Sequence, residues 1–535
     1  SEYAENDRLK IISSFTGSAG LAVILKKSNY LFVDGRYTIQ AENEAGKNFR
    51  IIEIHKKLPH TIIKNCKLGF DPKLFTTSKL KHYFSNNIKL VSINENLIDK
   101  IYKNKTKKTK QFFSLSKKIT GENHQSKIKK ITNFLKINKA DYLFVSAPEN
   151  VAWLLNIRGY DNPTSPIPNS RLIIGKNKRL LLITEKKNVQ KIIREKKITK
   201  DQVIDFHELE LLINQLKGAN FIIDNLSCSV FIEKIIKSKF RILSQRDPIY
   251  KLKSIKNYSE IKHMIEAHKK DGLALTKFIY WIKNINKKNI TEVDAQNKLE
   301  KFRKMSSNYL YPSFNTIAGT GPNGAIVHYR ATKLNTKKIN KDDIFLCDSG
   351  GQYKYGTTDV TRTLCFSKPK QYIKDAFTKV LKGHIAVALT NLNKDDTGKK
   401  IDVRARKFLK KDNLDYAHGT GHGVGFFLNV HEGPQSISKY NSIKITKGMI
   451  LSNEPGFYKK NHFGIRIENL LYVKQKNNSL YFENLTLAPI EKDLINYNLL
   501  DKIEKNYLFK YHFSIYAEYS SLLNNKERKW LASLI

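Results

Sequence analysis

One stretch of the chain, residues 328–468, limits what the protein can fold into, because acidic and histidine side chains gather there among glycines. Asp348 and Asp359 lie eleven residues apart, Glu454 stands before Pro-Gly, and Glu468 closes the run G-I-R-I-E. His328, His418, His422 and His431, from the chain's 14 histidines, all fall inside the same stretch. A lone histidine is usually structural, but several histidines beside four acids are hard to explain by packing alone.

The sequence around the two aspartates predicts a hairpin. A strand-like run leads into Asp348, and glycines permit a tight reversal before Asp359, so the two carboxylates could lie side by side. Like charges at that distance repel and raise one pKa unless a cation compensates. For this pair alone, an ordinary hairpin with polar turn residues is the favoured alternative.

The two glutamates lie in strand-like surroundings. In residues 464–468, strict alternation places Arg466 and Glu468 on one face and two isoleucines on the other. That charged face is either exposed to solvent or part of a site. Glu454 precedes Pro455, where a strand breaks and a side chain can be aimed into a cleft.

One imidazole and four carboxylates form a hard, oxygen-rich ligand set for one or two divalent cations. Such a set suits Mn²⁺ best, with Co²⁺ or Zn²⁺ possible. Two ions about 3.5–4 Å apart can share a bridging water, lower its pKa and polarise a carbonyl group. The pattern therefore predicts metal-assisted hydrolysis.

The length of 535 residues predicts two to four domains. Residues 1–110 and 128–224 each alternate short strands and helices, as two similar modules would. Beyond Pro248 we expect a long amphipathic helix from Ser259 through Trp281 and a second helix with Thr291 as its N-cap. Strands and glycine turns follow, and the tail beyond Asp501 is predicted to be helical and to pack on the catalytic domain.

The net charge of +46 has two interpretations. It could attract nucleic acid or an anionic membrane, or it could reflect a compositional bias towards Lys, Asn and Ile. The lysines are scattered, apart from the run at 103–110, which is typical of a solvated linker. We favour the bias and expect neither a nucleic-acid nor a membrane partner.

The compartment is predicted from what the sequence lacks. No run approaches the roughly 18 apolar residues of a membrane span, and no signal peptide is visible at the start. The four cysteines form no C-x-x-C pair, which argues against a disulfide scaffold, a zinc knuckle or an iron–sulfur site. These features favour a soluble protein of a reducing compartment, the cytoplasm.

Longer motifs carry a resemblance to a known family. The order Asp, Asp, His, Glu, Glu resembles that of the pita-bread metallopeptidases: methionine aminopeptidase, prolidase and aminopeptidase P. The runs T-G-P-N-G-A-I-V-H-Y, D-S-G-G-Q-Y-K-Y-G-T-T-D-V-T-R-T, H-G-T-G-H-G-V-G and S-N-E-P-G-F-Y resemble Xaa-Pro aminopeptidases of family M24, in their long three-domain form. Matches of this length are more specific than any short motif.

The resemblance implies an α/β (α+β) architecture. Two creatinase-N-type domains would occupy 1–112, trimmed at its start, and 113–252. A pita-bread catalytic domain would occupy 253–500, and a helical extension 501–535. The family further implies a homodimer.

The resemblance also implies roles for residues at matching positions. Asp348 would bind the first metal, Asp359 would bridge, and His422 would bind the second, with Glu454 and Glu468 completing two Mn²⁺ sites per subunit. Glu454 would also exchange protons with the bridging water, and His328 and His431 would contact the scissile carbonyl and stabilise the oxyanion. His418 would line the proline pocket, and Arg466 would order the metal ligands. Arg36 would contact the substrate. The implied substrates are peptides with proline at the second position. Phe426 and Phe427 depart from the family pattern at the pocket edge, whereas none of the five ligand positions does.

Two rivals remain. A prolidase would apply the same chemistry to Xaa-Pro dipeptides, but two N-terminal domains and the H-G-T-G-H run argue against it. A non-catalytic pita-bread protein would bind nucleic acid or histones, but such relatives usually lose the metal ligands, and this chain retains all five.

Overall fold

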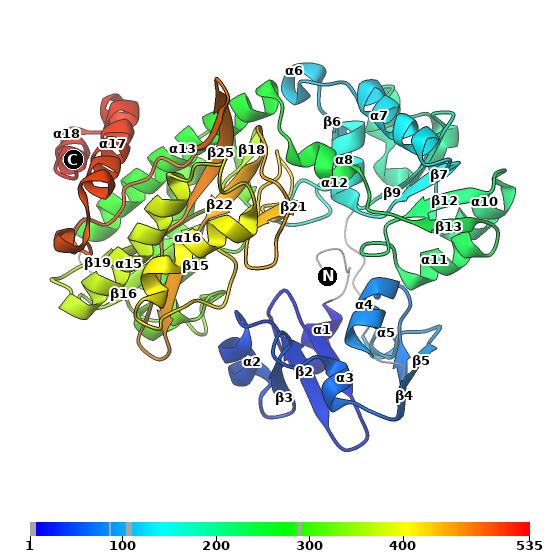
Figure 1. Ribbon diagram of the computed structural model, residues 1–535, viewed down its shortest axis with the longest axis horizontal. Helices are drawn as coiled ribbons and strands as arrows, with labels where there is room; N and C mark the ends of the chain where they lie inside the picture. The colour runs from blue at the N-terminus through cyan, green and yellow to red at the C-terminus, as the bar shows by residue number, and fades with distance from the viewer. Residues whose placement is uncertain (1–6, 85–86, 103–109, 286–289) are drawn as a thin grey trace. The chain divides into compact units, whose positions relative to one another are not determined.

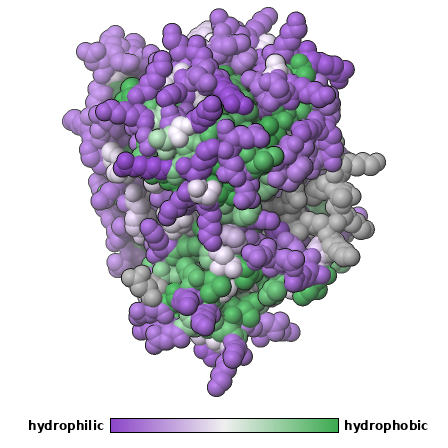
Figure 2. Space-filling model, turned by 90° about the vertical axis from the view of Figure 1, so that its right-hand side faces the viewer, coloured by the Kyte–Doolittle hydropathy of each residue, from purple (hydrophilic) through white to green (hydrophobic). Residues whose placement is uncertain are grey.

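The computed structural model describes residues 7–84, 87–102, 110–285 and 290–535. Residues 103–109 of the lysine run lie outside this set, so the linker prediction is not tested there. The chain separates into two compact units, Ser1–Lys253 and Ser254–Ile535 (Figure 1). Among the described residues, no helix is both long and apolar enough to cross a bilayer. Hydrophilic side chains cover most of the face shown in Figure 2, as the lysine content leads one to expect.

The first part of unit 1 is built around two small sheets. Its elements are α1 (Arg8–Ser13), β1 (Leu21–Ile24), β2 (Asn29–Val33), α2 (Thr38–Ala45), β3 (Arg50–Glu53), α3 (Pro59–Ile62), β4 (Cys66–Phe70), α4 (Thr77–Tyr83), β5 (Ile88–Ser92) and α5 (Leu97–Ile101). Strands β1 and β2 pair antiparallel, β3 adds parallel to β2, and β4 pairs parallel with β5. Phe15, Leu31 and Val33 pack against α2 in a common core.

The second part of unit 1 is a six-stranded mixed sheet in the order β11-β10-β9-β7-β12-β13. Its elements are β6 (Phe113–Ser114), α6 (Lys117–Thr120), α7 (His124–Ile137), β7 (Tyr142–Val145), α8 (Pro148–Leu155), β8 (Ile157–Arg158), β9 (Arg171–Gly175), β10 (Leu180–Ile183), α9 (Gln190–Arg194), β11 (Val203–Ile204), α10 (Leu209–Gln215), β12 (Asn220–Ile223), α11 (Val230–Lys237), β13 (Arg241–Ser244) and α12 (Ile249–Ser254). The predicted alternation of strands and helices is confirmed in both parts of the unit.

Unit 2 begins with the two predicted helices, α13 (Tyr258–Asn284) and α14 (Glu292–Lys304). Asn257 and Thr291 cap them, each in a capping box with the acid three residues on, so orphan amides at both N-termini are satisfied. Ala318, Phe345 and Val360 pack against these helices in one buried cluster. The helices thus form a layer behind the strands that carry the acidic residues.

The strands of unit 2 form two principal sheets, β15-β16-β19 and β21-β20-β22-β25-β26. The strands are β14 (Tyr309–Pro312), β15 (Ile317–Thr320), β16 (Ile344–Ser349), β17 (Gly351–Tyr353), β18 (Gly356–Thr357), β19 (Val360–Cys365), β20 (Gly421–Gly423), β21 (Glu432–Ile437), β22 (Ile450–Asn453), β23 (Gly456–Lys459), β24 (Phe463–Arg466), β25 (Asn469–Lys476) and β26 (Ser479–Asn484). Helices α15 (Gln371–Ala388) and α16 (Gly398–Lys410) pack on each other and on the strands.

The C-terminal tail is helical, as predicted, in α17 (Lys502–Tyr519) and α18 (Asn525–Ala532). Leu508, Tyr511 and Ile515 of α17 share a buried cluster with α15 and β24. The predicted packing of the tail on the domain before it is therefore confirmed.

Candidate metal centre

The two aspartates come from neighbouring strands. Strands β16 and β19 pair antiparallel, with Asp348 opposite Thr361, and Asp359 directly precedes β19. The predicted hairpin is present, but its connection is not a simple turn. It contains β17 and β18, and β17 also pairs with β14. The inserted strands anchor the reversal, so the two carboxylates are held by the sheet itself.

The remaining candidate ligands lie where strands of the second sheet end. His422 is in β20, Glu454 directly follows β22, and Glu468 lies between β24 and β25. Backbone hydrogen bonds join these places: Glu454 N donates to Thr420 O at 2.8 Å, and Glu468 N donates to Thr361 O at 3.1 Å. The second bond joins β19 of the first sheet to Glu468, which directly precedes β25 of the second sheet. It therefore ties the two sheets together close to the acids.

The functional atoms converge. Ligand atoms of Asp359, His422 and Glu468 all lie within 4.8 Å of one another. His422 Nε2 is 3.4 Å from Asp359 Oδ2 and 3.5 Å from Glu454 Oε1. His422 Nδ1 lies 2.8 Å from Gly423 O, a contact in which Nδ1 donates, and Nε2 is the ring nitrogen that faces the acids.

Asp348, Asp359 and Glu468 are buried, Glu454 is half-buried beside them, and little charge compensates the four acids. Burial and the nearby Asp348 and Glu454 carboxylates raise the pKa of Asp359 well above its ordinary value. Burial, then Asp359, Glu454 and Asp348, do the same for the pKa of Glu468. The pKa of Glu454 is also raised by burial and Asp348, against the opposing effects of His422 and Arg466. Crowding of acids in a dry site is costly without a cation.

Two oxygens identify where a cation would bind. Among the described residues, Asp348 Oδ1 and Glu468 Oε1 are buried without a hydrogen-bond partner, although their sister oxygens have one each. Buried polar atoms are rarely left unsatisfied. Four carboxylates and an imidazole match the charge and hardness of two divalent cations. The residues therefore fit a dinuclear metal centre, and their geometry does not select one metal.

Neighbouring side chains hold the acids in place. Arg466 Nη2 donates to Asp348 Oδ2 at 2.5 Å, and its Nε donates to Thr361 Oγ1 at 3.0 Å. Thr361 Oγ1 in turn donates to Glu468 Oε2 at 2.7 Å. Ser452 Oγ donates to Glu454 Oε1 at 3.0 Å. Arg466 and Glu468 are both buried, so the charged strand face belongs to a site and not to the solvent surface.

Arg466 also connects the acids with His418. Its Nη1 donates to Tyr458 OH at 2.6 Å, and this hydroxyl lies 2.9 Å from His418 Nε2. Tyr458 belongs to the run S-N-E-P-G-F-Y but was not assigned a role from the sequence. Alternation along β23 could have predicted a role for Tyr458. It places Tyr458 on the same strand face as Gly456, which lies two residues after Glu454.

The other predicted residues have different settings. His431 is exposed, and its ring centroid lies 4.3 Å from that of His422. His328 is half-buried and follows the 3₁₀ turn Gly321–Ala325. The chain around it is held by buried Glu292, which accepts hydrogen bonds from Thr320 N and Asn323 Nδ2. Arg36 belongs to unit 1, where it makes a two-pronged ion pair with Asp34.

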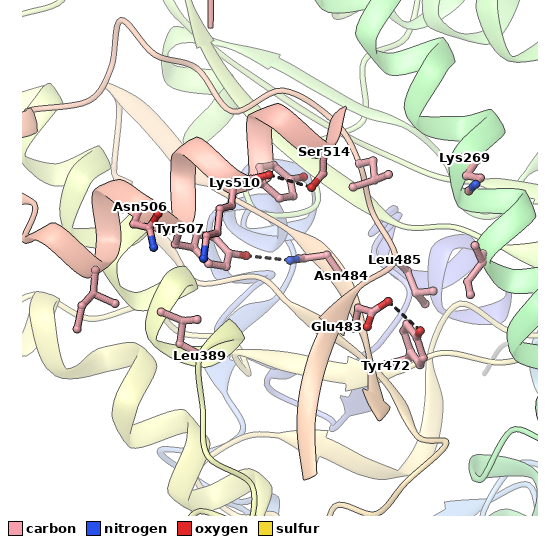
Figure 3. A pocket seen from close by; sticks show the side chains of 14 residues that line it. Lys269, Leu389, Tyr472, Glu483, Asn484, Leu485, Asn506, Tyr507, Lys510 and Ser514 are labelled. Atoms are coloured by element: carbon pink, nitrogen blue, oxygen red, sulfur yellow. Dashed lines mark hydrogen bonds between the residues drawn. The ribbon is translucent and has the colours of Figure 1, made fainter. Parts of the chain in front are cut away.

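Sequence reasoning also missed Arg362. This buried guanidinium donates to Glu468 O at 2.7 Å and to Thr361 O at 2.8 Å. It also donates, at 3.0 Å, to the hydroxyl of Tyr511, a residue of α17. Tyr511 lines a cavity of about 500 Å³ between α13, α17 and the β25–β26 hairpin (Figure 3). Figure 3 shows the hydrogen bond in this cavity that Asn484 Nδ2 donates to the Tyr507 hydroxyl. None of the candidate metal ligands lines it.

A cluster of carboxylates beside an imidazole, on strands of a mixed α/β unit, fits the class of metal-dependent hydrolases. The model described as metallopeptidase family M24 matches residues 262–475, and its C-terminal region matches 478–534. Two models of the creatinase/prolidase N-terminal domain match 5–101 and 103–260.

Full-length relatives narrow the family further. The chain is 37% identical to a probable Xaa-Pro aminopeptidase P of Laccaria bicolor, covering 99% of this chain and 88% of the relative. It is 36% identical to Xaa-Pro aminopeptidase 1 of Dictyostelium discoideum, covering 100% and 92%. The chain belongs to metallopeptidase family M24, among the three-part proteins with two creatinase-type N-terminal domains and a pita-bread catalytic domain.

Solved structures agree with this placement. The X-prolyl aminopeptidase of Caenorhabditis elegans, described as a cytosolic enzyme with a di-nuclear active site, superposes with a TM-score of 0.90 at 29% identity, covering 100% of this chain and 93% of that one. The prolidase of Pyrococcus furiosus superposes with a TM-score of 0.54 at 24% identity and covers 67% of this chain. The latter shows the shared fold alone.

Proposed function

We propose that the protein is an Xaa-Pro aminopeptidase, which hydrolyses the bond between the N-terminal residue of a peptide and a proline at the second position. The observation that carries this proposal is the convergence of Asp359, His422 and Glu468 in a buried, acid-rich centre, in a chain that matches enzymes of this name along its whole length. An Xaa-Pro bond is a tertiary amide without an N–H group, so a dedicated site is needed to cleave it.

The five side chains Asp348, Asp359, His422, Glu454 and Glu468 would hold two divalent cations. When bound, such a pair supplies an acidified water and polarises the scissile carbonyl. Glu454 is suited to exchange the proton of the attacking water, because its carboxylate is half-buried at the edge of the centre, with Oε1 3.5 Å from His422 Nε2. Ser452 directs one of its oxygens and leaves the other available.

The histidines divide the remaining work. His431 and His328 are proposed to donate hydrogen bonds to the carbonyl oxygen as negative charge develops on it. His418 is proposed to form a wall of the proline pocket, with its ring fixed through Tyr458. Arg36 of the first module is proposed to contact the substrate, and an ion pair with Asp34 orients its guanidinium.

Three finer features belong to the same proposal. We propose Mn²⁺ as the native metal, because an oxygen-rich set with one imidazole suits it. We propose a homodimer and a cytoplasmic location. The C. elegans relative is described as cytosolic, which supports the location. Metal analysis of the purified protein, light scattering and fractionation would test these features separately.

Prolidase activity is the second candidate, because the prolidase of Pyrococcus furiosus shares the fold over 67% of this chain. The aminopeptidase is favoured because the relatives that match both N-terminal modules are named Xaa-Pro aminopeptidases. The two activities differ in the length of the peptide that follows proline.

The decisive experiment measures metal content together with hydrolysis of bradykinin and of Gly-Pro, before and after chelation. We expect release of the N-terminal arginine from bradykinin, loss of this activity on chelation, and its return with Mn²⁺. Faster turnover of Gly-Pro than of bradykinin would favour the prolidase. Unchanged hydrolysis after complete removal of metal would overturn the proposal.

A further inference from the structure

A buried ion pair on α16 lies behind the segment that leads into His422. Asp402 and Arg406 are one helical turn apart and are 1% and 2% exposed. Arg406 Nε donates to Asp402 Oδ2 at 2.7 Å. A pair this deep is not explained by stability alone, because removing both charges from water costs about as much as their attraction returns. Its remaining hydrogen bonds indicate its role.

Those hydrogen bonds all reach residues 415–420. Arg406 Nη1 donates to Tyr416 O at 2.8 Å and to Asp415 Oδ1 at 2.5 Å, and Nη2 donates to His418 O at 2.6 Å. The guanidinium carbon lies 3.9 Å from the centre of the Tyr416 ring. A planar, forked cation can make all these contacts at once, which a lysine ammonium cannot.

Asp402 holds the other end of the same segment. Thr420 Oγ1 donates to Asp402 Oδ1 at 2.6 Å and lies 2.5 Å from Tyr416 OH. Residues 415–420 are neither helix nor strand, so side-chain bonds from α16 replace the ladder that would otherwise fix their backbone. Asp402 and Arg406 therefore use their charged groups to orient residues 415–420.

The segment carries two parts of the proposed active site. It presents His418, which contacts Tyr458. It also supplies Thr420 O, which accepts the backbone N–H of Glu454 at 2.8 Å. The ion pair on α16 therefore holds a short backbone segment that bonds to Glu454 and carries His418. These are the proposed proton carrier and the proposed wall of the proline pocket.

We propose that Asp402 and Arg406 are positioning residues, which hold His418 and Glu454 in register so that an Xaa-Pro peptide binds productively. This inference rests on the proposed function for its kinetic consequence but not for its structural one. It assigns no contact with substrate or metal to either residue.

The test compares Arg406→Lys with Arg404→Lys, the same substitution on the same helix at an exposed residue that pairs with Asp395. We expect Arg406→Lys to lower kcat/KM for bradykinin about 10- to 100-fold, because small displacements of a site cost that much. Arg404→Lys should stay within about twofold of the parent, since exposed pairs contribute little. Equal kinetics in the two variants would overturn the inference.

A second pair of variants covers the case in which Arg406→Lys folds poorly. Thr420→Val removes the hydroxyl that donates a hydrogen bond to Asp402, and Thr420→Ser retains this hydroxyl. Activity lost in Thr420→Val and recovered in Thr420→Ser supports positioning, whereas equal loss in both contradicts it.

Amide hydrogen exchange gives a readout that does not depend on activity. The Glu454 amide, whose acceptor is Thr420 O, should exchange faster in Arg406→Lys than in Arg404→Lys. If the parent fails to cleave Xaa-Pro peptides, the proposed function is wrong, and exchange alone decides this inference. Unchanged exchange of Glu454 would then refute it.

Discussion

The described residues of unit 2 contain two groups of potential metal ligands, which contrast in how their charge is balanced. Asp359, His422 and Glu468 form the first, and Cys365, Glu491 and Asp493 form the second. In the second group, Lys283 Nζ donates to both oxygens of Glu491 at 2.7 Å and to Asp493 Oδ2 at 2.8 Å. An ammonium therefore already occupies the place where a cation would bind.

The thiol of the second group lies beside the same ammonium. Burial, then the nearby Glu491 carboxylate, raise the pKa of Cys365 to about 12, and the Lys283 charge opposes this rise. Beside the first group, Arg466 donates to one oxygen of Asp348, whereas Asp348 Oδ1 and Glu468 Oε1 stay buried without a hydrogen-bond partner. The comparison teaches that unsatisfied buried charge, and not clustering of acids, distinguishes the metal centre.

The largest expected effect separates the two groups directly. Asp359→Ala should reduce hydrolysis of Xaa-Pro peptides by at least about a thousandfold, because a metal pair supplies several kcal/mol of transition-state stabilisation. Asp493→Ala, a matched loss of one acid from the lysine-filled group, should leave kcat/KM within about twofold of the parent. Steady-state kinetics with metal analysis checks both. Comparable losses in the two variants would erase the distinction.

The second prediction breaks the lysine-filled group. Lys283→Met leaves Glu491 buried without its cation and should lower the free energy of unfolding by about 2–4 kcal/mol, slightly discounted because Lys283 is partly exposed. Urea denaturation measures the change. The double variant Lys283→Met, Glu491→Gln should regain much of the loss, since no buried charge then remains unpaired. A double variant as unstable as the single one would contradict this account.

The third prediction concerns the side chains around the first group. Thr361→Val removes the hydroxyl that donates to Glu468 and accepts from Arg466. Metal affinity should fall about 10- to 100-fold, as it does when groups that orient ligands are removed. Thr361→Ser should bind metal nearly as the parent does. Competition with a chelator provides the measurement, and equal affinities in Val and Ser variants would be the contrary result.

The smallest effect is a pH dependence of the metal-free protein. Burial and mutual repulsion raise the pKa values of Asp359 and Glu468 above their ordinary 3.8 and 4.5. Between the ordinary and the raised values, the folded protein binds more protons than the unfolded chain, so the stability of the metal-free form falls as pH rises. Bound cations favour the ionised acids and should remove this slope.

Calorimetry across about pH 4.5–8, with chelator and with Mn²⁺, measures that difference. The metal-free Tm should fall with rising pH relative to the Tm of the metal-loaded protein. A gap between the two curves that is independent of pH would show that the acids of the first group are not coupled to metal binding.

Much of the fold could be predicted from local sequence. The capped helices α13 and α14, the antiparallel pair β9–β10 and strand β7 follow from caps, periodicity and β-branched residues, which act over a few neighbours. The hairpin between the aspartates was predicted only in outline. Its inserted strands β17 and β18 could not be foreseen, because β17 pairs with β14, which lies far earlier in the chain.

The candidate centre divides in the same way. The sequence alone determined which side chains are candidate ligands: four acids and an imidazole of the right chemistry, in an order that motif resemblance identifies. Only the tertiary structure decided which buried charges have partners. Arg362 meets Tyr511 across 149 positions, and Lys283 meets Glu491 across 208. Compensation of charge depends on distances between remote segments, and local patterns do not encode those distances.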